Sequence, residues 1–182
     1  MTQPTLTLVV EGPSDAEFIR AVLGKELTKQ TRFFTGRGKM SLASLGRNIL
    51  VDQGGPVLVV MDADTTNQRM ADEQKGMVRL ALSRFGTAED FDVFQFMPTI
   101  EIVFFESPAA LRLLLNREVS DATVRDGLLI PKATLNALRS NEDSTRTSDR
   151  IDPRVGELLA AGKQAGAFRE AVRRLLNQHA EA

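Results

Sequence analysis

The chain has 182 residues, of which 42% are hydrophobic and 26% charged, and this is the composition of one globular domain with room for a small addition. Its 23 basic and 24 acidic residues leave a net charge of -1, so no bulk attraction to polyanions is visible. The absence of Cys and Tyr, and a single His at position 179, exclude thiolate chemistry, cysteine-bound zinc, a tyrosine nucleophile and multi-histidine metal sites.

The sequence also lacks the marks of a membrane or exported protein. No apolar run is long enough to cross a bilayer, and the first residues, Met-Thr-Gln-Pro, have no basic segment of the kind that opens a signal peptide. We therefore expect a cytoplasmic location and no membrane partner.

The first hundred residues alternate between short apolar runs and helical patterns. Ser14-Asp15-Ala16-Glu17 has the spacing of a capping box, which predicts Ser14 as the N-cap of the first helix. In the third helix, Met70, Met77, Leu80 and Ala81 are expected to face inward. The predicted strands are residues 6–10, 32–35, 57–61 and 91–96. The predicted helices between them cover about 14–29, 41–53 and 68–85.

This alternation predicts an α/β fold, Rossmann-like, with about four mostly parallel strands and flanking helices. The last third predicts helices only, at 108–116, 120–129, 131–138 and 153–180, with a break near Gly162 and Gly166 in the last of them. We therefore divide the chain into an α/β core at 1–100 and a helical extension at 101–182, which packs on or beside the core. Residues 140–152 are almost entirely polar and predict an exposed loop.

Carboxylates follow three of the four predicted strands. Glu11 ends the first, with Asp15 one helical turn later; Asp62-Ala63-Asp64 ends the third; and Glu101 follows the fourth. The carboxyl ends of parallel strands meet at one edge of a sheet, so these side chains are expected to converge there. Like charges that close repel each other unless a cation lies among them, and oxygen ligands without His or Cys select Mg²⁺ or Mn²⁺.

Each of these residues also has a purely structural interpretation. Asp62 and Asp64 suit a turn, and Asp15 suits the positive end of a helix dipole. If the chain around Glu101 is extended, Glu101 faces away from Ile100 and Ile102 and is solvated. The joint placement of Glu11 with the Asp62 and Asp64 pair favours a functional site over these alternatives.

Two basic positions have comparable alternatives. Gly36-Arg37-Gly38-Lys39 could hold a phosphate, although a tight turn is the favoured interpretation. Lys132 could be catalytic, although an ordinary surface lysine is favoured there.

Three motifs resemble a known family. LVVEGPSDAEFI, TGRGKMSL and VLVVMDAD, in this order and spacing, resemble the TOPRIM domain of topoisomerases, bacterial primases and several nucleases. The resemblance covers residues 5–98 and is nearest to the overcoming-lysogenization-defect type nucleases and their small stand-alone relatives. It departs from the topoisomerase branch in lacking Tyr and from the primase branch in lacking zinc-binding Cys.

The resemblance implies metal-dependent hydrolysis of phosphodiester bonds in nucleic acid, in phage defence or nucleic-acid processing. It implies that Glu11 is the acid/base or a metal ligand and that Asp62 and Asp64 hold Mg²⁺ or Mn²⁺. Asp15 and Glu101 would complete a second metal position. The candidate contacts to DNA or RNA are Arg37, Lys39, Arg169, Arg173 and Arg174.

Two other functions stay open. Asp62-Ala63-Asp64-Thr65-Thr66 also fits the signature of haloacid-dehalogenase-type phosphatases, with Asp62 as nucleophile, although no later Gly-Asp-x-x-x-Asp motif occurs. The fold could also serve as a non-catalytic nucleic-acid-binding module. Because many lysogenization-defect nucleases carry an ATPase and no phosphate-binding loop of that kind occurs here, a separate ATPase chain is a further expected partner.

Overall fold

The structure is a computed structural model that describes residues 5–139, 151 and 153–180. The polar segment predicted as a loop at 140–152 therefore lies outside the described residues, except for Ile151.

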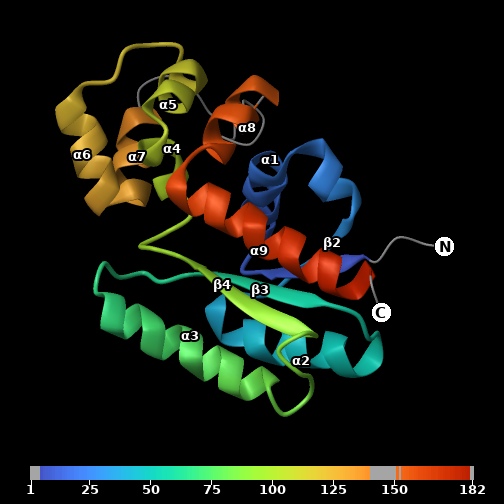
Figure 1. Cartoon of the computed structure of the whole chain (residues 1–182). Coiled ribbons are helices and arrows are strands. Elements are labelled where there is room, and N and C mark those ends of the chain that lie inside the picture. Colours follow the sequence, from blue (N-terminus) through green and yellow to red (C-terminus); the bar gives the residue numbers. More distant parts are fainter. Residues whose placement is uncertain (1–4, 140–150, 152, 181–182) are drawn as a thin grey trace.

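Four parallel strands form the sheet and confirm the predicted α/β class (Figure 1). They are β1 (Leu6–Val10), β2 (Thr31–Thr35), β3 (Val57–Asp62) and β4 (Phe91–Phe96), in the spatial order β2-β1-β3-β4. Each strand lies within about a residue of its predicted range, because short apolar runs bounded by Gly, Pro or polar residues define all four.

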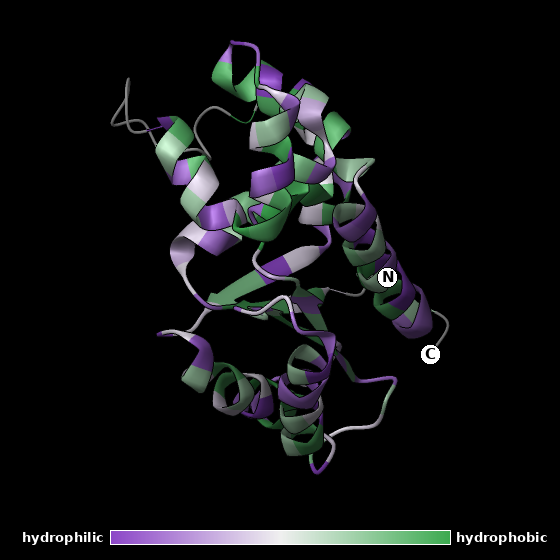
Figure 2. Ribbon diagram, turned by 90° about the vertical axis from the view of Figure 1, so that its left-hand side faces the viewer, coloured by the Kyte–Doolittle hydropathy of each residue, from purple (hydrophilic) through white to green (hydrophobic). Residues whose placement is uncertain are grey.

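Helices cover both faces of this sheet. On one face lie α1 (Pro13–Lys29) and α9 (Lys163–Ala180), and on the other lie α2 (Leu42–Asp52) and α3 (Gln68–Leu82) (Figure 1). A short 3₁₀ turn, η1 (Lys39–Ser41), precedes α2. Side chains of one strand alternate between the two layers: Leu6, Leu8 and Val10 join the core under α1 and α9, whereas Val9 joins the core under α2. In Figure 2 green, hydrophobic stretches of the strands alternate with purple and pale ones.

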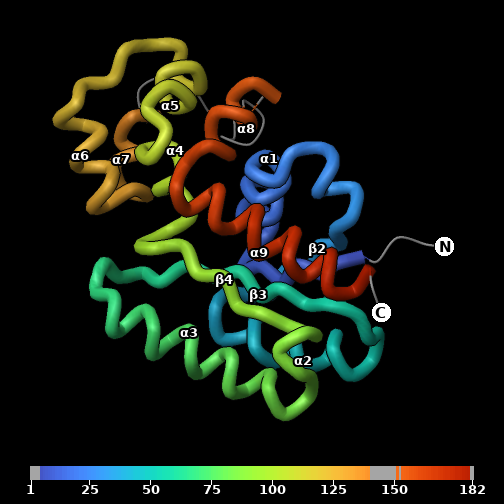
Figure 3. Tube along the Cα trace, viewed as in Figure 1, coloured from blue at the N-terminus to red at the C-terminus, as the bar shows by residue number. Residues whose placement is uncertain are grey.

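The remaining helices follow β4. They are α4 (Ile102–Glu106), α5 (Pro108–Leu115), α6 (Asp121–Leu129), α7 (Pro131–Arg139) and α8 (Pro153–Ala160). The tube in Figure 3 shows the chain leaving β4, passing through α4 to α8 above the sheet and returning along it as α9. One apolar core includes side chains from β1, α1, α5, α8 and α9, so the later helices share the core of the sheet.

The order of the strands reverses between β1 and β3. The chain passes from β1 outward to β2, returns across β1 to β3, and then continues outward to β4. In open parallel sheets, the crevice outside the carboxyl ends of the strands at such a reversal is the usual binding place. Glu11 follows β1, and Asp62 is the last residue of β3, so both lie at this point.

The predicted capping box of α1 is wrong. The helix begins at Pro13 with Gly12 as N-cap, so Ser14 lies inside the first turn. Proline suits this first position because its missing N–H has no helical partner there. The carboxylate of Asp15 accepts a hydrogen bond from the N–H of Gly12, and therefore performs the capping that the sequence predicted for Glu17.

The expected inner face of α3 is also wrong. Met70, Met77 and Leu80 are 50%, 65% and 65% exposed, and the buried residues are Ala71 and Leu82. The helix lies against β4 and α2 through this narrow stripe, so its larger apolar side chains face outward. The periodicity of the sequence predicted the helix correctly but did not predict which side of it is buried.

The last helices follow the prediction more closely. The chain breaks between α8 and α9 at Gly162, whose N–H donates to the carbonyl of Leu159, whereas Gly166 lies inside α9. The positions predicted as buried are Val155, Leu158, Leu159, Phe168, Val172, Leu175 and Leu176, and all but the half-buried Leu158 are buried. Within the described ranges, no helix combines the length and apolar character needed to cross a membrane.

Candidate functional site at the carboxyl ends of the strands

Glu11 and Asp62 meet where the strand order reverses. The Glu11 Oε1 atom accepts a hydrogen bond from the backbone N–H of Asp62 at 3.3 Å. The Asp62 Oδ1 atom in turn accepts from the N–H of Ile100 at 2.9 Å. These two bonds connect the exits of β1, β3 and β4, and each uses only one of the two oxygens of its carboxylate.

Asp15 and Glu101 complete the cluster around Asp62. The carboxylates of Glu101, Asp15 and Glu11 all raise the pKa of Asp62, and burial raises it further, to about 8. Burial is the largest cause, and the hydrogen bond from Ile100 offsets part of it. At neutral pH, without a bound cation, this structure therefore favours a protonated Asp62.

Two other members of the cluster share this perturbation. Burial raises the pKa of Glu11, with smaller contributions from the charges of Asp64 and Asp15. Burial also raises the pKa of Asp15, assisted by the charge of Glu101. Repulsion that extends over several carboxylates is the electrostatic condition that a bound cation relieves.

Glu101 reaches this cluster through a turn that the sequence did not predict. The chain is not extended there: after the cis peptide bond between Met97 and Pro98 it turns, and Glu101 is the N-cap of α4. Ile100 and Ile102 are therefore both buried while Glu101 is half-buried, which removes the solvated alternative. The α4 helix itself, Ile102–Glu106, was missed because five apolar and acidic residues carry no periodicity of their own.

Asp64 contributes to the raised pKa of Glu11 and is itself paired with a lysine. Its Oδ2 atom is 3.1 Å from the Lys39 Nζ atom, which also donates to the carbonyl of Ala63 at 3.4 Å. Asp64 has a left-handed backbone with φ of 54°, a conformation that Asp tolerates better than most residues. Its N–H donates to the carbonyl of Pro98, which ties the exit of β3 to the turn after β4.

The Gly36-Arg37-Gly38-Lys39 segment is a tight turn, as favoured from the sequence. The N–H of Arg37 donates to Ser41 Oγ at 2.8 Å, and the N–H of Gly38 donates to the carbonyl of Glu11 at 3.2 Å. These donors are therefore engaged within the protein and do not form an open cradle for a phosphate. The Arg37 side chain is exposed, and Lys39 is directed to Asp64.

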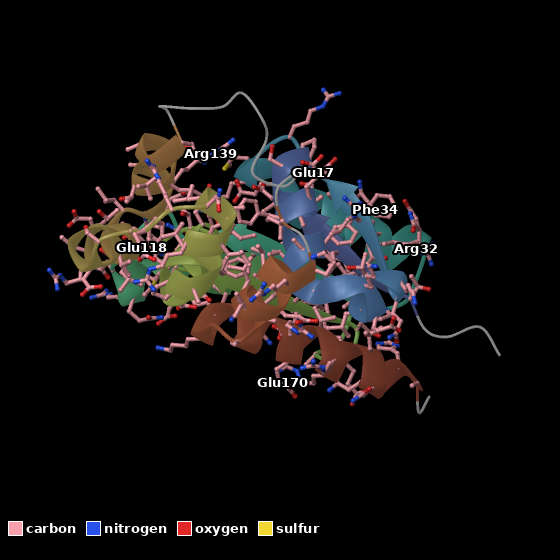
Figure 4. The ribbon with its side chains drawn as sticks, turned by 90° about the horizontal axis from the view of Figure 1, so that it is seen from above. Glu17, Arg32, Phe34, Glu118, Arg139 and Glu170 are labelled. Carbon is pink, nitrogen blue, oxygen red and sulfur yellow. The ribbon has the colours of Figure 1, made fainter. Side chains whose placement is uncertain are left out.

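The three arginines predicted on the last helix lie elsewhere. Arg174 pairs with Asp92, the second residue of β4, and so lies towards the opposite end of that strand from the carboxylates. Arg169 donates to the carbonyl of Val22, just before the break that Gly24 makes in α1 with φ of 74°. Arg173 lies 3.7 Å from Glu170, which Figure 4 labels on α9. The structure does not bring these side chains to the carboxylate cluster.

Lys132 is exposed, as its favoured interpretation as a surface lysine predicts. It is the second residue of α7, and its positive charge lowers the pKa of Asp15, partly offsetting the effect of burial. No signal in the sequence links residue 132 with Asp15, because this electrostatic effect depends on how α4, α6 and α7 pack together.

The donor chemistry of the cluster fits a hard divalent cation. Glu101 Oε2 and the Thr99 hydroxyl are both buried without a hydrogen-bond partner among the described residues. A cavity of about 10 Å³, lined in part by Glu11, Asp15 and Asp62, is just large enough for one water-sized occupant. In the part of the chain that the structure describes, however, no three acidic or histidine side chains converge closely enough to hold one ion as they stand.

A larger open cleft of about 870 Å³ lies between α5 and α8. Arg112, Arg117 and Arg154 line it together with Glu118 and Glu157, and none of the five predicted carboxylates does. Its mixed charges and lack of buried catalytic groups make the strand ends the stronger candidate site.

Comparison with known proteins supports the fold. No protein-family profile and no curated protein matches the chain. Among solved structures, the chain is similar to the C-terminal region of the Burkholderia pseudomallei OLD protein, with a TM-score of 0.57, 14% identity and coverage of 95% of this chain and 98% of that one. It is also similar to the C-terminal region of the Xanthomonas campestris pv. campestris OLD protein, with a TM-score of 0.46, 12% identity and coverage of 100% and 97%.

The first of these similarities confirms the predicted fold: the chain has the TOPRIM-type α/β fold of the OLD C-terminal region over almost its whole length.

Proposed function

We propose that the chain is a metal-dependent nuclease that hydrolyses phosphodiester bonds in DNA or RNA. The observation that carries the proposal is the meeting of Glu11, Asp15, Asp62 and Glu101 at the reversal of strand order, where burial and mutual repulsion raise the pKa of Asp62 to about 8. The TOPRIM-type fold adds support, because its solved neighbour is an OLD protein region.

Mg²⁺ or Mn²⁺ would be held by Glu11, Asp15, Asp62, Asp64 and Glu101. When bound, such ions supply positive charge that stabilises the developing charge of phosphodiester hydrolysis and lowers the pKa of water. The orphaned Glu101 oxygen and the all-oxygen ligand set support this assignment.

The residues of the chain have distinct tasks in this proposal. Glu11 has a raised pKa and accepts a hydrogen bond from Asp62 through one of its two oxygens, so it is suited to accept the proton of the attacking water. Lys39 and Lys132 place positive charge on two sides of the cluster and would orient the phosphate. Arg37 is exposed beside Lys39 and would contact a neighbouring phosphate.

The direct test is a cleavage assay on supercoiled DNA, linear DNA and structured RNA, each with Mg²⁺, Mn²⁺ or a chelator. We expect cleavage that the chelator abolishes and that both Asp62→Asn and Asp64→Asn abolish. Asp72→Asn is the matched control, since Asp72 is an exposed aspartate on α3 that accepts a hydrogen bond from Gln68. Full activity in either site variant would refute the assignment.

A non-catalytic nucleic-acid-binding module is the second candidate. It is favoured by one observation, that no three acidic or histidine side chains of the described residues converge on one ion, while Lys39 already neutralises Asp64. Isothermal titration with Mn²⁺ separates the two candidates: binding that Asp62→Asn removes supports the nuclease, and no binding supports the module. A separate ATPase chain remains a proposed partner for either function.

A further inference from the structure

A glutamine of the last helix holds the turn that follows β4. Gln164 is the second residue of α9, and its side-chain amide contacts Met97, the residue directly after β4, twice. The Gln164 Oε1 atom accepts a hydrogen bond from the N–H of Met97 at 2.8 Å, and its Nε2 atom donates to the carbonyl of Met97 at 2.7 Å. Because 67 residues separate the two along the chain, this contact ties the start of the turn to a distant helix.

An amide side chain suits this place because β4 is at the edge of the sheet. On the inner side, the carbonyl of Phe96 accepts from the N–H of Ala63 at 2.9 Å. The carbonyl of Pro98 accepts from the N–H of Asp64 at 2.8 Å. Met97 lies between these two residues, and in the part of the chain that the structure describes no strand lies beyond β4 to pair with it. A glutamine offers one acceptor and one donor, as a neighbouring strand would, and therefore satisfies both backbone groups of Met97.

The same glutamine also holds the far end of the segment that begins at Met97. Glu106 is the last residue of α4, and its Oε2 atom accepts a hydrogen bond from the backbone N–H of Gln164 at 2.7 Å. Gln164, Met97 and Glu106 are all half-buried, so water competes less for these hydrogen bonds than it would at the surface. Residues 97–106 are therefore fixed at both ends by one residue.

This segment supplies the β4 side of the carboxylate cluster. The N–H of Ile100 donates to Asp62 Oδ1 at 2.9 Å, and Ile100 lines the small cavity together with Glu11 and Asp62. Glu101 follows directly, and its buried Oε2 atom has no hydrogen-bond partner among the described residues. The positions of the Ile100 N–H and the Glu101 carboxylate depend on the path that the chain takes after β4.

We propose that Gln164 is a positioning residue for the carboxylate cluster. It holds residues 97–106 so that the Ile100 N–H stays on Asp62 and Glu101 is presented to the cation. Gln164 does not line the small cavity in the described structure, so it acts through Met97. The inference rests on the proposed function, and it gives the helical extension a part in metal binding, beyond covering the sheet.

The experiment replaces the amide of Gln164 and leaves the length of its side chain. Gln164→Met removes the paired donor and acceptor that Met97 uses, and Gln164→Glu is the milder variant, because it keeps an acceptor for the N–H of Met97. Gln178→Met is the matched control, since Gln178 is an exposed glutamine near the other end of the same helix. Three quantities are measured for each protein: the exchange rate of the Ile100 amide hydrogen by NMR in chelator, the affinity for Mn²⁺ by isothermal titration, and cleavage as a function of Mn²⁺ concentration.

We expect Gln164→Met to exchange the Ile100 amide about tenfold faster than the wild type, without a change at the amides of β3, and to bind Mn²⁺ about tenfold more weakly. Cleavage should fall at low Mn²⁺ and recover at saturating Mn²⁺. Gln164→Glu should change the same quantities in the same direction but less, and Gln178→Met should behave as the wild type.

A role in stability alone would lower the midpoint of urea denaturation but leave the Mn²⁺ affinity of the folded protein unchanged. An unchanged Ile100 exchange rate in both Gln164 variants, or an unchanged affinity in both when the wild type binds Mn²⁺, would overturn the proposal. If the wild type neither bound Mn²⁺ nor cleaved any substrate, the nuclease function would fail instead, and the Ile100 exchange rate alone would decide whether Gln164 positions the turn.

Discussion

Asp62 and Asp92 occupy neighbouring strands of one sheet in opposite electrostatic surroundings. Asp92, near the start of β4, contacts Arg79 of α3 at 2.5 Å and Arg174 of α9, and its side chain is only 14% exposed. Asp62, at the end of β3, is surrounded by Glu11, Asp15 and Glu101. The register pairs Leu58 with Asp92 and Asp62 with Phe96, so the two aspartates are offset by four residues, or about 13 Å, along the strands.

These surroundings distinguish a carboxylate with a structural role, Asp92, from one with a proposed chemical role, Asp62. Two helices on opposite faces of the sheet each supply an arginine to Asp92, and Asp92 therefore joins α3 to α9 across the edge strand. Among the described residues, no ion pair involves Asp62, Glu11 or Asp15, so their repulsion is left for another cation to neutralise. A cluster that destabilises the fold on its own is the expected property of a functional site.

The largest effect should come from removing one charge at each place and measuring cleavage. Asp62→Asn keeps the size of the side chain but removes a proposed metal ligand, so we expect cleavage to fall by about 100-fold or more. Asp92→Asn should leave the cleavage rate of folded protein within about twofold. If the two variants lost activity equally, the distinction between a structural and a chemical carboxylate would be wrong.

The free energy of unfolding should rank the two variants in the opposite order: Asp92→Asn should lose stability, whereas Asp62→Asn should not. In Asp92→Asn, Arg79 and Arg174 lose their shared partner, and we expect the free energy of unfolding to fall by about 2 kcal/mol, less than for a fully buried pair because both arginines are about half exposed. Urea denaturation of this variant and of Asp62→Asn, both in chelator, makes the comparison. A double-mutant cycle with Arg174→Gln measures how much of the loss belongs to that one pair.

The contrast also explains what the sequence could predict. Glu11, Asp15, Asp62, Asp64 and Glu101 were located because each follows a strand within a few residues, and parallel strands bring such positions to one edge. The strands themselves were predictable because their apolar runs are short and bounded by turn residues, as at Gly12-Pro13 and Gly55-Pro56.

What the sequence could not predict depends on packing between distant segments. The pairing of Arg174 with Asp92 is one example, because 82 residues separate the two along the chain and no local pattern links them. The effect of the Lys132 charge on the pKa of Asp15 and the outward face of α3 have the same origin. Periodicity reports which side chains share a face, whereas the choice of the buried face is made by the neighbouring helices.

The pH dependence of stability should differ between the two carboxylates in metal-free protein. Asp62 has a folded-state pKa of about 8 against 3.8 for its ordinary value, so the folded protein binds the proton more tightly and its stability falls as the pH rises from about 4 to about 8. Asp62→Asn does not titrate. We therefore expect this variant to gain up to about 6 kcal/mol over the wild type across that window, with a constant difference above it.

Urea denaturation in chelator at pH 5, 7 and 9 measures this difference, and Asp72→Asn, at an exposed position on α3, serves as the control. Saturating Mn²⁺ should cancel the gain, because a cation favours the ionised form that only the wild type can adopt. A difference between Asp62→Asn and the wild type that is the same at all three pH values would contradict the raised pKa.

The smallest change in stability is expected at Lys39, which forms an ion pair with Asp64 and also lowers the pKa of Glu11. Its ion pair with Asp64 is largely exposed on the aspartate side, so Lys39→Ala should change the free energy of unfolding by about 0.5 kcal/mol or less. The same variant removes a charge that lowers the pKa of Glu11, so that pKa should rise further and the cleavage rate should reach its plateau at a higher pH. Carboxyl titration by NMR and a pH profile of cleavage test this shift. A stability loss as large as that of Asp92→Asn, without a change in the pH profile, would show that Lys39 and Asp64 form a structural pair like that at Asp92.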